Sequence, residues 1–199
     1  MTEERYRYDV FLSYARGGTV ELFVRDVFFE PFIRALREAH PHREPTVFLD
    51  EQSIGVGEQI PDEVRAALPH SRIMLAFLSP MYTHKAWCLE EWRAFSGPSP
   101  AGGPPRLYPL LVQDGEHLEA QVWHRAKWDP RFKDLLLQHP AHLTTPDGRT
   151  LLREIGDLAE TLIEYILQVQ DPPAPLPAAP RPVVAPMQRT FPDLRGSDG

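Results

Sequence analysis

The chain has 199 residues, of which 42% are hydrophobic, and this content suffices for one well-packed domain. Its formal net charge of −7 argues against direct binding to nucleic acid or to an anionic membrane, because both attract basic surfaces. A single cysteine excludes an internal disulfide framework and a cysteine-based structural zinc site. The first residues lack a signal-peptide pattern, and no apolar run approaches the roughly 20 residues of a membrane span, so we expect a cytoplasmic protein.

The first predicted strand and helix form the N-terminal part of the core. Tyr8–Ser13 is a short apolar run rich in residues that favour β-structure, and it leads into a loop, 15–18, with two glycines. Apolar residues then recur at a 3–4 spacing from Val20 to Ala39, which predicts a helix with Thr19 as its N-cap. Pro31 falls within this stripe, so we expect a kink or a break there, with the apolar face continuing beyond it.

Two further strands follow, separated by a polar loop and a short helix. Pro45–Leu49 is the second predicted strand, and Ser71–Ser79 is the third. The third is apolar on both faces, as central strands of parallel sheets are. The loop between them, 50–61, contains two glycines, and Asp62–Leu68 is predicted to be the short helix.

The stretch Ser79–Phe95, centred on Ala86–Phe95, places an acid where a helix is otherwise aromatic. At about 100° per residue, Glu90 falls on the polar side, whereas Glu91 falls within an arc of roughly 140°. The other residues of that arc are Trp87, Cys88, Trp92 and Phe95. A buried, unpartnered carboxylate commonly costs several kcal/mol, so Glu91 must be salt-bridged, protonated or facing a cleft that a ligand fills. On geometry alone, a carboxylate paired with an arginine at the rim is as good an interpretation as the cleft.

The region after this helix contains a fourth strand and then loses its periodicity. Arg106–Val112 is the strand, and Pro109 within it removes one ladder hydrogen bond, which fits a position near the edge of the sheet. A short fifth strand is predicted near Ala120–Trp123, and one or two helical turns are predicted over Phe132–Leu137.

The last predicted element is a helix. Apolar residues recur without interruption from Leu151 to Leu167, and Asp147 or Thr150 can cap the start. Eight of the 22 prolines lie between Pro172 and Pro192, a segment without helical or strand periodicity. We therefore expect a globular domain over 1–170 and a disordered tail or linker over 171–199, which joins a partner or domain that the sequence does not identify.

Alternating strands and helices with continuous apolar strands predict an α/β fold, in which helices cover both faces of a parallel sheet. In such sheets ligands bind beyond the carboxyl ends of the strands. The unusual polar features follow the first three strands: Arg16 with its two glycines, the 50–61 loop, and the helix with Glu91. Their convergence at one edge predicts a functional site there.

At this point the sequence resembles the Toll/interleukin-1 receptor (TIR) domain family. Tyr8–Tyr14 is similar to its first-strand box, and Phe48–Asp50 with the glycine-containing loop after it is similar to its second. Trp87–Glu91 resembles the Trp-Cys-x-x-Glu box of bacterial and plant members. Three boxes in the right order make the resemblance specific over about 6–95.

The resemblance implies a flavodoxin-like, three-layer fold with about five strands in the order 2-1-3-4-5. It also implies one of two activities. Enzymatic members cleave the nicotinamide–ribose bond of NAD and release ADP-ribose or its cyclic form, whereas adaptor members only associate with other TIR domains. NAD is then a substrate, so neither a cofactor nor a metal is expected, and a role in signalling or defence is the family-level expectation.

The family's site residues transfer to positions of this chain that match its motifs. Glu91, four positions after the tryptophan of the box, corresponds to the catalytic glutamate. The expected substrate contacts are Ser13, Tyr14, Ala15, Arg16, Phe48, Asp50 and Trp87. The expected assembly loop consists of Ser53, Ile54, Gly55, Val56 and Gly57, through which one copy docks on the next.

One carboxylate is chemically sufficient for this reaction. Nicotinamide is cationic while bound to ribose and leaves as a neutral molecule, so it needs no general acid, unlike the leaving group of an ordinary glycosidase. A carboxylate can stabilise the positive charge that grows on the ribose, and Phe48 or Trp87 can provide a wall, although large aromatics beside a sheet more often belong to the core. The sequence therefore favours an NAD-cleaving enzyme, with a non-enzymatic adaptor as the alternative.

Other candidate sites are weaker. Cys88 is better interpreted as a buried thiol than as a nucleophile. The histidine pairs His40/His42 and His139/His142 lie in proline-broken loops without carboxylate partners, which indicates surface histidines rather than a metal site.

Overall fold

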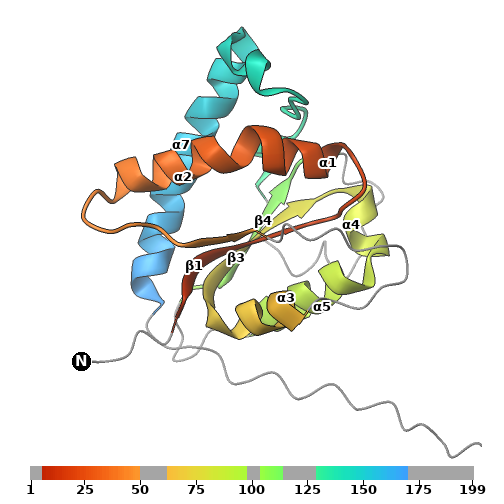
Figure 1. Cartoon of the computed structure of the whole chain (residues 1–199), viewed down its shortest axis with the longest axis vertical. Coiled ribbons are helices and arrows are strands. Elements are labelled where there is room, and N and C mark those ends of the chain that lie inside the picture. The colour runs from red at the N-terminus through yellow and green to blue at the C-terminus, as the bar shows by residue number, and fades with distance from the viewer. Residues whose placement is uncertain (1–5, 50–61, 98–103, 114–128, 170–199) are drawn as a thin grey trace, which may run out of the picture.

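A computed structural model describes residues 6–49, 62–97, 104–113 and 129–169 of the chain (Figure 1). At its centre lies a parallel sheet in the order β2-β1-β3-β4. The strands are β1 (Tyr8–Tyr14), β2 (Val47–Leu49), β3 (Ser71–Leu78) and β4 (Leu107–Leu111). This topology confirms the predicted α/β class, the parallel sheet and the order of the first four predicted strands.

The outer edge of β4 is bridged by a later part of the chain. Asp129 forms a parallel bridge with Leu110, and the Leu111 N–H donates to the Asp129 carbonyl at 2.9 Å. Because N–H groups alternate in direction along a strand, the missing N–H of Pro109 belongs to this outer side and removes no bond to β3. The predicted fifth strand, Ala120–Trp123, lies outside the described residues.

One face of the sheet is covered by α1 (Thr19–Leu22), η1 (Phe23–Phe28), α2 (Phe29–Ala39) and α7 (Pro146–Gln168) (Figure 1). Alternate residues of the central strands point toward these helices, since successive side chains of a strand face opposite sides. The largest fully buried side chains of this layer are Phe23, Phe28, Phe32, Phe77 and Phe132. The helical stripe after Thr19 is therefore buried as its spacing predicts.

The irregularity that Pro31 predicts takes the form of π-helical turns just before it. The Phe29 N–H donates to the Val24 carbonyl, five residues back, and α2 then continues through Pro31. Phe28 and Phe32 are both fully buried, so the apolar face does continue across the proline. The wider turns absorb the bond that Pro31 cannot make, and no break is needed.

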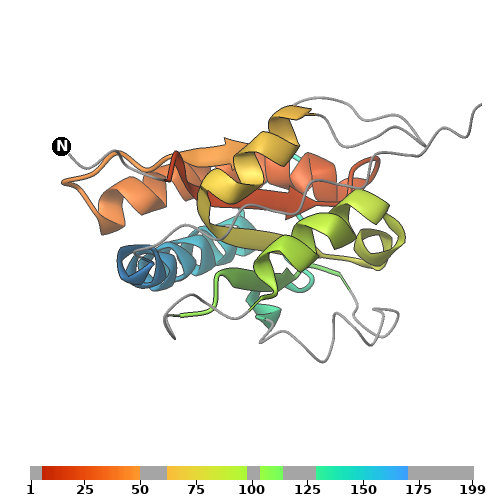
Figure 2. The ribbon, with the colours of Figure 1, turned by 90° about the horizontal axis from the view of Figure 1, so that it is seen from below.

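The opposite face is covered by α3 (Asp62–Ala67), α4 (Pro80–His84) and α5 (Ala86–Phe95). Figure 2, seen from below, shows α3 and α5 lying across the strands. Phe11 and Met74 point from the sheet into this layer and share one buried cluster with Trp92 and Phe95 of α5. Helices on both faces confirm the predicted three-layer arrangement, with two apolar cores separated by the sheet.

The helix caps differ from the predicted ones. Gly18, rather than Thr19, is the N-cap of α1, and the Glu21 carboxylate accepts the Gly17 N–H at 2.8 Å. Gly17 has φ 88°, a left-handed conformation that glycine adopts without strain, so the turn places Thr19 inside the helix.

The long C-terminal helix begins earlier than predicted. Its N-cap is Thr145, which accepts the Gly148 N–H at 3.1 Å, because Pro146 takes the first helical position. Neither Asp147 nor Thr150 is therefore the cap. The helical turn predicted over Phe132–Leu137 is also displaced, and the structure has a 3₁₀ turn, η4, at Pro130–Phe132 instead.

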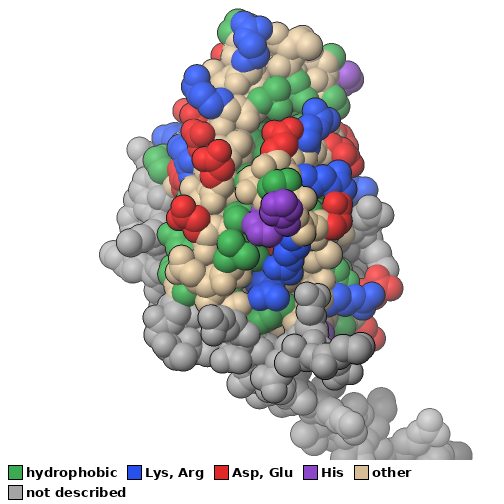
Figure 3. Space-filling view, turned by 90° about the vertical axis from the view of Figure 1, so that its left-hand side faces the viewer, with side chains coloured by type: hydrophobic (Ala, Val, Ile, Leu, Met, Phe, Trp, Pro, Cys, Tyr) green, Lys and Arg blue, Asp and Glu red, His purple; other side chains and the backbone are tan. Residues whose placement is uncertain are grey.

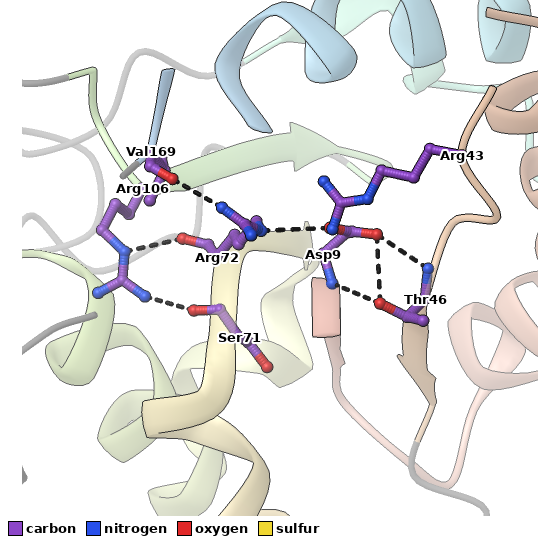
Figure 4. A network of polar contacts seen from close by, with 7 residues as sticks. All are labelled: Asp9, Arg43, Thr46, Ser71, Arg72, Arg106 and Val169. Atoms are coloured by element: carbon purple, nitrogen blue, oxygen red, sulfur yellow. Dashed lines mark hydrogen bonds and ion pairs between the residues drawn. The ribbon is translucent and has the colours of Figure 1, made fainter. Parts of the chain in front are cut away.

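A polar network ties together the edge of the sheet where the strands begin (Figure 4). The Asp9 carboxylate pairs with Arg43 at 2.6 Å and with Arg72 at 3.3 Å. Arg72 also donates to the carbonyl of Val169, at the end of α7, at 2.8 Å, and Arg106 donates to the Arg72 carbonyl at 2.7 Å. These contacts join β1, β3, the start of β4 and the end of α7, so the network is part of the scaffold.

The surface at the left of Figure 1 is solvated and mixed in charge. Figure 3 shows acidic and basic side chains interspersed over this face. Arg37 of α2 donates to Glu44 at 2.8 Å, and both side chains are more than half exposed. Among the residues that the structure describes, none of the helices combines the length and the apolarity that a membrane crossing requires.

Candidate active site

The helix α5 presents an acid to the interior of the protein. Cys88, Glu91, Trp92 and Phe95 are buried, whereas Glu90 is exposed, as the helical spacing predicts. Glu91 is only 5% exposed, and no arginine forms a direct ion pair with it among the described residues. The rim interpretation, in which Glu91 pairs with an arginine at the surface, therefore does not fit these residues.

Two hydroxyl groups connect Glu91 to β1 and α4. The Ser13 hydroxyl donates to Glu91 Oε2 at 2.6 Å, and the Tyr82 Oη lies 2.6 Å from Ser13 Oγ. Ser13 is next to the last residue of β1, so the Glu91 carboxyl group lies at the carboxyl end of a central strand. This is the edge at which parallel α/β sheets bind ligands.

Burial changes the acidity of this group. It raises the pKa of the Glu91 carboxyl from the ordinary 4.5 to about 7, because a carboxylate loses its hydration in the apolar layer. The Ser13 hydrogen bond and the positive charge of Arg16 both lower the pKa but do not offset the effect of burial. Near neutral pH, Glu91 is therefore poised between its charged and neutral forms.

The predicted residues after β1 divide between the two faces of the sheet. Ala15 lies in the same apolar layer as Glu91. Tyr14 is buried in the layer on the other face, although its backbone carbonyl accepts a hydrogen bond from the Cys88 thiol at 3.6 Å. Arg16 is 8% exposed and acts on Glu91 through its charge.

The two predicted aromatic walls pack at different places. Phe48 stacks on Phe11, with ring centroids 5.1 Å apart, and it is half-buried in β2. Trp87 is half-buried at the start of α5, and the Lys85 ammonium lies 5.0 Å from the centre of its ring. Both rings contact the apolar layer around Glu91 and keep part of their surface exposed.

Comparison with known proteins agrees with these features. Residues 10–136, more than half of the chain, match the TIR domain family. The chain belongs to the TIR domain family. A solved structure, described as the TIR domains of an activated Roq1 resistosome that directly recognises the pathogen effector XopQ, is 20% identical and covers 81% of this chain and 96% of its own. Its TM-score is 0.38, a value too low to support conclusions beyond the match itself.

Part of the predicted site of this TIR domain lies outside the described residues. Asp50 and the whole predicted assembly loop, Ser53, Ile54, Gly55, Val56 and Gly57, belong to that part of the chain. The proline-rich segment 171–199 does as well. Their predicted roles therefore stay predictions.

The sequence did not single out Tyr82, whose hydroxyl contacts the Ser13 hydroxyl that donates to Glu91. The stretch before α5 is a separate short helix, α4, which starts at Pro80 after the N-cap Ser79 and ends before Lys85. The Ser-Pro pair signals a helix start, and Tyr82 comes two residues after the proline. Its contact with Ser13 spans 69 residues of sequence, so no local pattern indicates it.

Two of the weaker candidates, Cys88 and His139, have structural roles. The Cys88 thiol is fully buried, and burial raises its pKa well above the ordinary value, as expected of a core thiol. His139 accepts the Ala141 N–H through Nδ1 at 3.1 Å and so caps the turn η5 (Pro140–Thr144).

Proposed function

We propose that this TIR domain hydrolyses the nicotinamide–ribose bond of NAD, with the Glu91 carboxylate as its catalytic group. The observation that supports the proposal most is a buried carboxyl group at the carboxyl end of a central strand, the edge where parallel α/β sheets bind ligands. An acid in an apolar layer reduces stability, and ionisable groups with strongly shifted pKa values concentrate at functional sites.

The reaction requires charge stabilisation more than proton transfer. The bond between ribose C1′ and the nicotinamide nitrogen breaks, and its electron pair leaves with nicotinamide, which becomes neutral. Water then supplies a hydroxyl group to C1′ and releases a proton to solvent. A carboxylate beside C1′ stabilises the positive charge on the ribose, more strongly in a low-dielectric layer, and its removal is expected to reduce the rate by about 10²–10³.

The acidity of Glu91 sets the pH dependence of this chemistry. Because the carboxyl has a pKa of about 7, only part of the free protein has the charged form at neutral pH. The cationic nicotinamide ring favours the carboxylate on binding. We therefore expect turnover at low substrate concentration to rise with pH up to about the pKa of Glu91 and then to level off.

The remaining predicted contacts receive matching roles. Arg16, at the end of β1, is the candidate partner of the pyrophosphate. Phe48 and Trp87, both half-buried beside the layer around Glu91, are candidate walls for the flat rings of NAD. Self-assembly through the Ser53–Gly57 loop is the proposed trigger, in a signalling or defence pathway, and the tail is the proposed attachment to a further partner.

The test is NAD turnover by the purified full chain, free and artificially clustered, with nicotinamide and linear or cyclic ADP-ribose separated by chromatography. Glu91→Gln should reduce turnover by about 10²–10³ and remain folded. The matched control is Glu90→Gln, which changes the neighbouring exposed acid on the polar face and should leave turnover intact. Unchanged turnover in Glu91→Gln would remove this residue from the mechanism.

A second candidate function is a non-enzymatic adaptor that signals through TIR–TIR association. The observation that favours it is that the Glu91 carboxylate already accepts a hydrogen bond from Ser13 within the protein. An adaptor predicts no loss of NAD even when the protein is clustered. It also predicts signalling that is sensitive to changes at Ile54 or Gly55 and insensitive to Glu91→Gln.

A further inference from the structure

The hydrogen bonds around Glu91 have a definite direction. An ionised carboxylate can only accept, and a serine hydroxyl has one proton, so in the charged form of Glu91 the Ser13 proton is donated to Glu91 Oε2. The 2.6 Å contact between Ser13 Oγ and Tyr82 Oη therefore requires Tyr82 to be the donor. The chain of donation runs from Tyr82 through Ser13 to Glu91.

Tyr82 is held as a permanent donor. Its side chain is fully buried, and the ring packs edge-on against Trp92 with centroids 6.3 Å apart. Burial raises the pKa of the Tyr82 phenol well above its ordinary value, and the nearby negative charge of Glu91 acts in the same direction. The phenol thus keeps its proton throughout the range in which Glu91 titrates.

We infer that Tyr82 is a positioning residue, which acts through Ser13 to orient Glu91 and to favour the ionised form of its carboxyl group. A hydroxyl that accepts a hydrogen bond becomes a stronger donor, since the bonds polarise one another in a low-dielectric interior. A stronger donor stabilises the carboxylate relative to the acid. The catalytic meaning of this inference rests on the proposed function, whereas the hydrogen-bond chain is a feature of the fold.

Other groups also act on Glu91, but a change at Tyr82 leaves them in place. Arg16, after β1, lowers the pKa of the Glu91 carboxyl, and Glu90, on α5, raises it. Glu91 in turn raises the pKa of Cys88 on α5 and of Tyr14 on β1. Tyr82→Phe removes one oxygen atom from the chain and keeps the ring that packs against Trp92.

The experiment is a titration of Glu91 by ¹³C NMR, in full-length protein with labelled glutamate side-chain carbonyls. The resonance that disappears in Glu91→Gln identifies Glu91. In Tyr82→Phe its titration midpoint should rise by about half a pH unit. This is the size expected if the loss of cooperative polarisation weakens the charge-assisted Ser13–Glu91 hydrogen bond by a few tenths of its strength. Ser13→Ala, which removes the direct donor, should raise it further.

A matched control and a double variant separate this chain from general effects. Tyr108→Phe removes another hydrogen-bonded phenol, 3.1 Å from Asp129 on the outer edge of β4, and should leave the Glu91 midpoint unchanged. In a Ser13→Ala background, Tyr82→Phe should not raise the Glu91 midpoint any further, because the Ser13 hydroxyl that connects Tyr82 to Glu91 is gone. An unmoved midpoint in Tyr82→Phe overturns the inference. So does an effect of Tyr82→Phe that is as large in the Ser13→Ala background as in the wild type. If Tyr82→Phe does not fold, the Ser13→Ala midpoint decides: no rise overturns it.

The activity measurement distinguishes this inference from the proposed function. If the protein cleaves NAD, the pH profile of turnover in Tyr82→Phe should shift upward by the same amount as the NMR midpoint. If neither the pH profile of turnover nor the Glu91 midpoint moves in Tyr82→Phe while turnover is intact, the role of Tyr82 is refuted and the proposed function stands. A shifted midpoint in a protein that never cleaves NAD refutes the proposed function and leaves the hydrogen-bond chain standing.

Discussion

The buried acid makes the folding stability of this TIR domain depend on pH in an unusual direction. Burial raises the pKa of the Glu91 carboxyl from the ordinary 4.5 to about 7, so the folded protein binds this proton more tightly than the unfolded chain does. The stabilising contribution is therefore fully present below pH 4.5 and is lost as the pH rises through about 7. Most carboxyl groups in proteins act in the opposite sense, because pairing lowers their pKa.

The size of the effect follows from the two pKa values. Each unit of difference corresponds to about 1.4 kcal/mol, so the Glu91 contribution amounts to about 3 kcal/mol. Glu91→Gln removes the titration, and the glutamine can still accept the Ser13 hydroxyl through its amide oxygen. Relative to this variant, the wild type should lose about 3 kcal/mol of unfolding free energy between about pH 4.5 and about pH 8.

Urea denaturation across that range measures the difference directly, because contributions from all other groups cancel between the two proteins. Glu90→Gln serves as the control and should follow the wild type, since Glu90 is exposed. A difference between wild type and Glu91→Gln that stays constant with pH would refute the reasoning. It would mean that Glu91 titrates as in water, and the low-dielectric site that the proposed catalysis needs would not exist.

Two further predictions concern the scaffold. Gly148→Ala should destabilise the domain by about 1–3 kcal/mol, because the added Cβ would overlap the backbone of the preceding turn. Gly156→Ala, whose Cβ meets open space in the same helix, should stabilise the domain by about 0.5–1 kcal/mol. Equal shifts of the thermal midpoint in the two variants would contradict this. Asp9→Asn should cost about 2–3 kcal/mol in urea denaturation, because it leaves the partly buried Arg43 and Arg72 without a carboxylate. Glu44→Gln, which changes an exposed ion pair, should have little effect on stability. Similar losses of stability in Asp9→Asn and Glu44→Gln would show that the Asp9 network adds no more than a surface ion pair.

Local patterns were sufficient to predict much of the fold and the helix face on which Glu91 lies. The unbroken apolar runs of β1 and β3 indicated buried parallel strands, and the 3–4 spacing before and after Pro31 indicated one continuous apolar face. The helical spacing placed Glu91 within an aromatic arc, and the structure shows that this side of the helix is buried. Each of these signals depends on the repeat of a single element, so the sequence displays it directly.

Helix ends and polar contacts were less predictable. Thr145 caps α7 because Pro146 occupies the first turn, although Asp147 and Thr150 were equally good capping residues by type. The Asp9 network escaped detection because its arginines come from segments far apart in the sequence, Arg43 and Arg72, and each looks like an ordinary surface residue when taken alone.

By itself, the sequence determined that this chain forms a parallel α/β domain and that the acid at position 91 lies within an aromatic stripe of its helix, since both follow from the spacing of apolar residues along single elements. The tertiary structure alone decided what that acid meets. Parallel pairing of β1 with β3 and the packing of α4 and α5 on one face bring Ser13, Tyr82 and Glu91 within hydrogen-bonding distance. Contacts of this kind depend on the distances between separate elements, and the spacing of apolar residues within one element carries no information about those distances.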